Sequence, residues 1–137
     1  MGLTVVDAGV IIGFLDEADA HHRAARGALA AAVERADRLV LPASGYAESL
    51  VGPARRGPDA VATVDRFLTR LPIEIVPLGP EVAAAAASLR ARHRSVKLPD
   101  ALIIATAIVL DADRVLTTDR RWPSKSKLGL RAAISSV

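Results

Sequence analysis

The sequence predicts an α/β fold in which a mostly parallel central sheet of four to five strands carries helices on both faces. Three observations lead to this fold class. Short β-branched runs alternate along the chain with longer stretches rich in Ala, Leu and Arg. Strands that are separated by helices imply right-handed crossovers and therefore a mostly parallel sheet. Hydrophobic residues make up 51% of the chain and aromatic residues only 3%, so Ala, Val, Leu and Ile must form the core.

The elements follow one another in a regular order. Four β-branched runs are expected to form strands, over residues 3–7, 38–42, 73–76 and 114–118. Helices are expected over about 9–15, 21–36, 44–56, 58–70, 80–94 and 99–110, from their composition. Pro80 and Pro99 mark two helix starts, because proline has no hydrogen bond to lose in the first turn. No repeat, linker or low-complexity block divides the chain, so residues 1–137 are expected to form one domain.

Composition narrows the class of protein. The chain has no cysteine, which excludes disulfides, thiolate metal sites and a cysteine nucleophile, and which fits a reducing cytoplasm, the expected location. Asp7 interrupts the first apolar stretch, no basic leader precedes it, and no apolar run reaches the roughly 18–20 residues of a membrane span. We therefore expect neither a signal peptide nor a membrane partner. The net charge of +3 is compatible with a polyanionic partner.

Ligands of parallel α/β sheets bind beyond the carboxyl ends of the strands, and this rule sorts the 15 Asp and Glu residues. Asp7 ends the first expected strand and Asp119 follows the fourth. Glu48 lies one turn into the helix after the second strand, and Asp100 lies in the first turn of the helix that "LPDALIIATA" begins. Other acids lie in loops, beside basic residues, within the third strand, or, like Asp111, at the opposite edge. Asp7, Glu48, Asp100 and Asp119 can therefore converge at one edge.

Each of these acids also has a simpler explanation. Asp7 suits a helix N-cap, Glu48 a solvated helix position, Asp100 the positive end of a helix dipole and Asp119 a turn. Together, however, four carboxylates at a water-poor edge repel one another, and must take up protons or bind a cation. Oxygen ligands select Mg²⁺ or Mn²⁺. Such ions, held by carboxylates, activate water for phosphodiester hydrolysis.

Several segments closely resemble the PIN-domain ribonucleases, in particular the VapC-type toxins of bacterial toxin–antitoxin pairs; they are "VVDAGVII", "DEADAHHRAA", "PASGYAES", "LPDALIIATA" and "VLTTDRRW". The resemblance covers nearly the whole chain and implies a PIN-like three-layer fold. It also implies that Asp7, Glu48, Asp100 and Asp119 are catalytic, and that they bind Mg²⁺, for which Mn²⁺ can substitute. Many relatives carry Ser or Thr directly after the first Asp. This chain has Ala8, so an orienting hydroxyl would have to come from Thr117 or Thr118.

The predicted function is that of a Mg²⁺-dependent endoribonuclease, the toxin of a VapBC-type pair, which hydrolyses RNA with metal-activated water. The expected partners are RNA, a VapB-type antitoxin and a second copy of the chain, in a homodimer and in toxin–antitoxin hetero-oligomers. Apolar residues between Ser44 and Arg70 are candidates for the antitoxin surface or for the core: Leu50, Val51, Val61, Val64 and Phe67. The alternatives are a housekeeping PIN-type nuclease without antitoxin, a non-catalytic RNA-binding module and a phospho-accepting receiver. A receiver needs adjacent acids near the first strand, which "VVDAG" lacks.

Two basic clusters flank the predicted site in the sequence: Arg90, Arg92, His93, Arg94 and Lys97, and Arg120, Arg121, Lys125 and Lys127. They can bind RNA phosphates along the cleavage site. Alternatively, the first cluster complements the dipole at a helix C-terminus and the second belongs to a solvated tail. His21 and His22 are expected to be surface or packing residues, because no carboxylate spacing makes them a metal motif. Trp122 is expected to pack the loop after Asp119.

Overall fold

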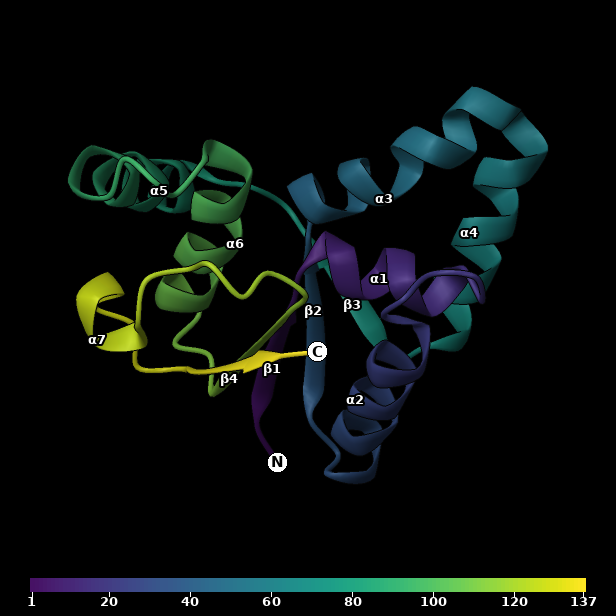
Figure 1. Ribbon diagram of the computed structural model, residues 1–137, viewed down its shortest axis with the longest axis horizontal. Coiled ribbons are helices and arrows are strands. Elements are labelled where there is room, and N and C mark those ends of the chain that lie inside the picture. The colour runs from purple at the N-terminus through teal and green to yellow at the C-terminus, as the bar shows by residue number, and fades with distance from the viewer.

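A five-stranded, all-parallel sheet forms the centre of the computed structural model, which describes all 137 residues (Figure 1). Its strands are β1 (Leu3–Val6), β2 (Arg38–Pro42), β3 (Ile73–Val76), β4 (Arg114–Thr117) and β5 (Ala133–Ser136), in the spatial order β3-β2-β1-β4-β5. The parallel α/β prediction is confirmed. Strand β5 was not expected, because its short segment AISS ends in two serines; it forms by pairing with β4, with Ile134 opposite Val115.

Seven helices connect and flank the strands: α1 (Ala8–Leu15), α2 (His22–Glu34), α3 (Ala43–Arg56), α4 (Pro58–Arg70), α5 (Pro80–Arg92), α6 (Leu98–Val109) and α7 (Lys125–Leu128). Helices α1 to α6 agree with the predicted ranges to within two residues at each end. Helix α7 was not expected. Ser124 caps its start, and Gly129, at φ 66°, ends it in the left-handed conformation that glycine adopts without strain.

The helices form a layer on each face of the sheet. Neighbouring strand residues point to opposite faces, so Val5 and Val115 pack with α5 and α6, whereas Val6 and Leu116 pack with α1, α2 and α4. Figure 1 shows the same division, with α5, α6 and α7 on one side and α1, α2 and α4 on the other. The fold is therefore the expected three-layer arrangement. None of the helices combines the length and apolarity that a membrane crossing requires.

The order of the strands determines where a site can form. The chain leaves β1 toward β2 and β3, and later returns to the other side of β1 as β4 and β5. In open parallel sheets this reversal marks the usual ligand site, at the carboxyl ends of the strands. Helices α1 and α3 begin there, directly after β1 and β2. Helix α3 sits so close to β2 that a Cβ on Gly45 would lie 3.0 Å from Leu41 Cδ1.

Candidate active site

Asp7 lies between β1 and α1, and it is the N-cap of α1. Its carboxylate accepts two hydrogen bonds, from the Ala8 N–H (2.8 Å) and from the Thr117 hydroxyl (2.7 Å). The residue is only 8% exposed. Burial raises the pKa of Asp7 above its ordinary value, the hydrogen bond from Thr117 opposes this rise, and the charges of Asp100 and Asp119 add to it.

Thr117 ends β4 and is fully buried. Besides donating to Asp7, its hydroxyl accepts a hydrogen bond of 3.0 Å from the Asp119 N–H. This one side chain therefore joins the end of β1 to the loop that carries Asp119. Thr118 has a different role: its hydroxyl lies where a Cβ on Gly9 would overlap it, so it packs against the first turn of α1. Of the two threonines proposed to compensate for Ala8, Thr117 is the one that contacts Asp7.

Asp100 lies in the first turn of α6, close to the other acids. Burial raises its pKa first and the charge of Asp119 second, while nearby Trp122, Arg121 and Lys97 lower it. Glu48 extends from the exposed side of α3. The pKa of Glu48 is also raised, by partial burial of its carboxyl group and then by the charges of Asp7 and Asp100. The two helices thus bring their acids into the field of Asp7.

Asp119 lies in the loop after β4. Its Oδ1 accepts a hydrogen bond of 2.7 Å from the Arg121 N–H and lies 3.5 Å from the Arg121 Nε. Asp100 and Asp119 together line a cavity of about 250 Å³, whose other lining residues are Ser95, Val96, Lys97, Arg121, Trp122 and Pro123. Of the two basic clusters, Lys97 and Arg121 are therefore the members that share a cavity with the acids. Arg90 and Arg92 instead bond backbone carbonyls at the end of α5.

The charges at this edge are mostly of one sign. Asp7, Glu48 and Asp100 form no ion pair, and Asp119 pairs only with Arg121, whose side chain is 91% exposed. As the side chains stand, no group of three or more His, Asp and Glu side chains is close enough to hold one metal ion. The donor set itself suits a hard divalent cation, because all of its atoms are carboxylate oxygens and only Lys97 and Arg121 partly offset their negative charge.

The acids excluded by their position lie elsewhere. Asp111 and Asp113 lie at the opposite edge, where both pair with Arg131 and Asp113 accepts a hydrogen bond from the Leu3 N–H. Glu74 pairs with Arg38 across β2 and β3, at 2.6 Å. These acids therefore form ion pairs on the surface, and they are separate from the carboxylates at the carboxyl edge.

The aromatic and histidine side chains agree with the packing roles expected for them. A ring nitrogen of His21 lies 3.1 Å from the Val137 carbonyl, and one of His22 lies 2.9 Å from the Gly13 carbonyl. Trp122 packs against the core formed by α5 and α6. Its indole nitrogen is buried without a hydrogen-bond partner, which no pattern in the sequence indicates.

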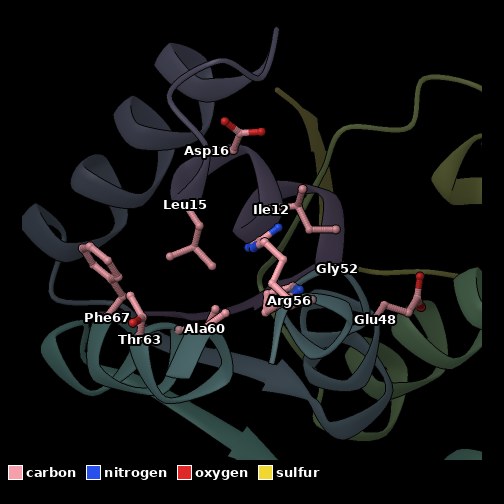
Figure 2. A pocket seen from close by; sticks show the side chains of 12 residues that line it. Ile12, Leu15, Asp16, Glu48, Gly52, Arg56, Ala60, Thr63 and Phe67 are labelled. Atoms are coloured by element: carbon pink, nitrogen blue, oxygen red, sulfur yellow. The ribbon is translucent and has the colours of Figure 1, made fainter. Parts of the chain in front are cut away.

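A larger groove of about 590 Å³ separates α1 from the α3–α4 pair. Figure 2 shows Glu48 at one end, Phe67 at the other and the guanidinium of Arg56 between them, beside Ile12. Of the apolar residues expected at a partner surface, Val64 and Phe67 line this groove, whereas Leu50 packs against the core. Ile12 and Phe67 are 40% and 43% exposed. The groove thus joins an exposed apolar surface to one of the four acids.

Comparison with known proteins places the chain in a family. A comparison with curated protein sequences finds no match. Similar solved structures include VapBC2 from Rickettsia felis, bound to a DNA fragment from the promoter (14% identity, TM-score 0.76, 98% of each chain covered). Others are DNA-bound VapBC from Salmonella typhimurium (17%, 0.72, 99% of this chain and 98% of that one) and Mycobacterium tuberculosis VapC20, a sarcin-ricin loop cleaving toxin (15%, 0.65, 82% and 86%). At these identities the likeness is one of fold. The family model of the PIN domain matches residues 4–128, and the chain therefore belongs to the PIN domain family.

Proposed function

We propose that this protein is a metal-dependent endoribonuclease and the toxin of a VapBC-type toxin–antitoxin pair. The observation that carries the proposal is the group of four carboxylates, Asp7, Glu48, Asp100 and Asp119, at the carboxyl edge of a PIN-domain sheet. The similar structures named above, which are a toxin that cleaves the sarcin-ricin loop and two VapBC proteins, support RNA as the substrate and an antitoxin as the partner.

The four carboxylates would hold Mg²⁺, with Mn²⁺ as a substitute, and the bound ion would polarise the scissile phosphate and lower the pKa of a coordinated water. The side chains around the site orient the ligands and attract the substrate. Asp7 keeps one orientation because the Ala8 N–H and the Thr117 hydroxyl each hold one of its oxygens. Lys97 and Arg121 line the same cavity as Asp100 and Asp119, and their charges attract RNA phosphates. Attack by water leaves a 5′-phosphate and a 3′-hydroxyl.

The groove between α1, α3 and α4 is the proposed antitoxin surface. Its apolar side chains fit the buried face of an amphipathic segment, and Glu48 at its end connects it to the acids. Arg56 points into the groove and forms no ion pair, so an acidic residue on the antitoxin would complement it. The homodimer and the toxin–antitoxin hetero-oligomer belong to the same proposal, and light scattering of the chain alone and with its antitoxin measures both.

Cleavage of end-labelled RNA by the purified chain tests the activity. We expect cleavage with Mg²⁺ and none with EDTA, and at least about a hundredfold loss in Asp100→Asn, because about 3 kcal/mol of lost transition-state stabilisation corresponds to more than a hundredfold in rate. Glu74→Ala is the matched control, since Glu74 pairs with Arg38 on the sheet. Cleavage that persists in EDTA and in Asp100→Asn would contradict the proposal. RNA binding without cleavage would favour a non-catalytic module.

Induction of the chain in bacteria separates a toxin from a housekeeping nuclease. The wild type should arrest growth, the antitoxin should relieve the arrest, and Asp7→Ala or Asp100→Ala should abolish it. A chain that cleaves RNA with Mg²⁺ and yet leaves growth unchanged is a nuclease of the housekeeping kind.

A further inference from the structure

The single tryptophan of the chain has an unused hydrogen-bond donor beside the acids. Trp122 lies in the loop that follows Asp119, and its ring packs against the core formed by α5 and α6. The indole nitrogen is buried from solvent and has no hydrogen-bond partner. Buried N–H groups nearly always find an acceptor, because water is not available to them. An unpaired donor at this place therefore calls for an acceptor that a small movement of a neighbouring side chain can supply.

Asp100 is an acceptor of suitable chemistry. Trp122 and Asp100 line the same cavity of about 250 Å³, and the indole lies close enough to lower the pKa of the carboxyl group. Asp7 and Asp119 each accept hydrogen bonds from neighbouring donors, at 2.7–2.8 Å. The Asp100 carboxylate accepts no hydrogen bond of good distance and angle, and Trp122 is the side-chain donor that lowers its pKa. The cavity therefore holds one carboxylate without a donor and one buried donor without an acceptor.

We propose that Trp122 is a positioning residue: its indole N–H donates to the Asp100 carboxylate and holds it in the orientation in which the four acids bind their metal ion. This inference rests on the proposed function. An indole can only donate, and its ring is fixed by packing, so it presents the N–H in one direction. Asp7 and Asp119 already accept hydrogen bonds from other donors, and Glu48 does not line this cavity. A phenylalanine keeps an aromatic ring at this place, but it is smaller than an indole and has no N–H to donate.

Metal affinity in a variant that keeps the ring tests this role. In Trp122→Phe an aromatic ring remains and the donor is lost, so Mg²⁺ should bind about 10–100-fold more weakly, as is common when a hydrogen bond behind a ligand is removed. The Mg²⁺ dependence of the melting temperature measures the affinity without any activity assay. Tyr46→Phe is the control, because it also removes a polar atom from an aromatic ring, where Tyr46 bonds Asp65. Its Mg²⁺ affinity should be unchanged.

The single tryptophan also gives one indole N–H signal in NMR, which reports the hydrogen bond directly. Mg²⁺ should move this signal downfield and slow its exchange with solvent in the wild type, but not in Asp100→Ala. This reading holds even if Trp122→Phe fails to fold. A wild-type chain that binds no Mg²⁺ would overturn both the proposed function and this inference. A wild-type chain that binds Mg²⁺, with an unmoved indole signal or an equal affinity in a folded Trp122→Phe, would overturn the positioning role alone.

Discussion

Asp7 receives its two hydrogen bonds from different parts of the fold. The Ala8 N–H belongs to the first turn of α1, so this bond comes with the helix start. The Thr117 hydroxyl comes from the neighbouring strand, 110 residues along the chain. Because both bonds go to the charged form of the carboxyl group, they oppose the rise in its pKa that burial causes. One carboxylate can thus cap a helix, stay buried and keep a fixed orientation at the edge of the sheet.

Thr117→Val should reduce RNA cleavage roughly ten- to hundredfold, because a hydrogen bond to a charged group contributes about 1.5–3 kcal/mol. Valine keeps the shape of the buried side chain and removes the donor to Asp7 and the acceptor for the Asp119 N–H. The hydrogen bond from Thr117 lowers the pKa of Asp7, so its loss should raise that pKa. The acid limb of the pH–rate profile should therefore also move to higher pH. Thr106→Val is the control, because that hydroxyl bonds a carbonyl within α6. Equal activity of both variants would contradict a role for Thr117.

Asp7→Asn or Asp100→Asn should raise the unfolding free energy of the metal-free chain at neutral pH. A carboxyl group whose pKa is higher in the folded state than in the unfolded state makes the folded state less stable as the pH rises through that window. The pKa values of Asp7 and Asp100 are raised above 3.8, mainly by burial, so the gain should fade as the pH falls toward 3.8. Urea denaturation in EDTA at several pH values measures it.

Asp113→Asn gives the control of opposite sign. A hydrogen bond from the Leu3 N–H, and then Arg131, lower the pKa of Asp113, so its charge stabilises the folded state at neutral pH and this contribution is lost as the pH falls through the lowered value. The variant should therefore be less stable at neutral pH. A pH-independent effect in all three variants would contradict the shifts in pKa on which these expectations rest.

At the scale of the elements, helix α1 reaches the sheet through a close approach at its second residue. A Cβ on Gly9 would overlap the hydroxyl of Thr118, in the loop directly after β4. Since Asp7 precedes this turn and Asp119 follows Thr118, the contact sets the spacing between the segments that carry two of the acids. The α3–α4 pair is held differently, by the hydrogen bond from Tyr46 to Asp65. It forms the wall of the groove that α1 faces.

Gly9→Ala should lower the unfolding free energy by about 1–3 kcal/mol, as over-packed positions commonly do. The double variant Gly9→Ala/Thr118→Ala removes the overlapping hydroxyl and should recover that stability, because alanine is otherwise the better helix residue. Urea denaturation of the wild type and the three variants completes the cycle. Additive effects of the two substitutions would show that the contact does not determine the approach of α1.

Arg56→Glu should weaken antitoxin binding by about tenfold or more, which corresponds to at least about 1.4 kcal/mol. The side chain points into the groove, where reversal of its charge repels the acidic residue proposed for the antitoxin. Arg66→Glu, also an arginine substitution in the α3–α4 pair, is the control because Arg66 does not line the groove and bonds Thr63. Calorimetry with the purified antitoxin measures both. Equal antitoxin affinities of the two variants would show that the groove is not part of the antitoxin interface.

At the scale of the whole molecule, the two edges of the sheet differ in their charges: the acids at the amino edge form ion pairs, whereas most of those at the carboxyl edge do not. At the amino edge, Arg131 pairs with Asp111 and Asp113, and the Asp113 carboxylate bonds the start of β1. At the carboxyl edge, burial first and then neighbouring carboxylates raise the pKa of Asp7, Glu48 and Asp100, and the only ion pair is that of Asp119 with Arg121. The chain thus keeps its stabilising pairs away from the repulsion that a bound cation would relieve.

Mg²⁺ should therefore raise the melting temperature, whereas an equal ionic strength of NaCl should not. At a concentration 100-fold above its Kd, an ion that binds only the folded chain stabilises it by about 2.7 kcal/mol. Asp100→Ala should lose most of this gain. Asp111→Asn should keep it, and asparagine suits the positive φ of 51° at that position better than alanine does. A melting curve that Mg²⁺ leaves unchanged would exclude a metal site at the carboxyl edge.

The order of the elements follows from the amino-acid sequence alone, because strand and helix propensity are local properties. Strands β1 to β4 and helices α1 to α6 could be read from composition and β-branched runs, and the PIN resemblance is confirmed by the family match. Position relative to the strand ends was enough to select Asp7, Glu48, Asp100 and Asp119, whose catalytic roles stay predictions. Strand β5 could not be predicted, since the AISS segment extends only by pairing with β4.

The contacts between side chains at the carboxyl edge depend on the folded arrangement of the whole chain. The choice of Thr117 over Thr118 as the donor to Asp7, the overlap that excludes a side chain at Gly9 and the unpaired indole of Trp122 all depend on packing between distant segments. The distances between the acids depend on it too, and they leave no three of these groups close enough to hold one ion as they stand. Local sequence patterns predict the edge of the sheet at which a residue such as Asp7 lies. The orientation of its side chain depends on contacts between distant segments, such as the hydrogen bond from Thr117 across 110 residues.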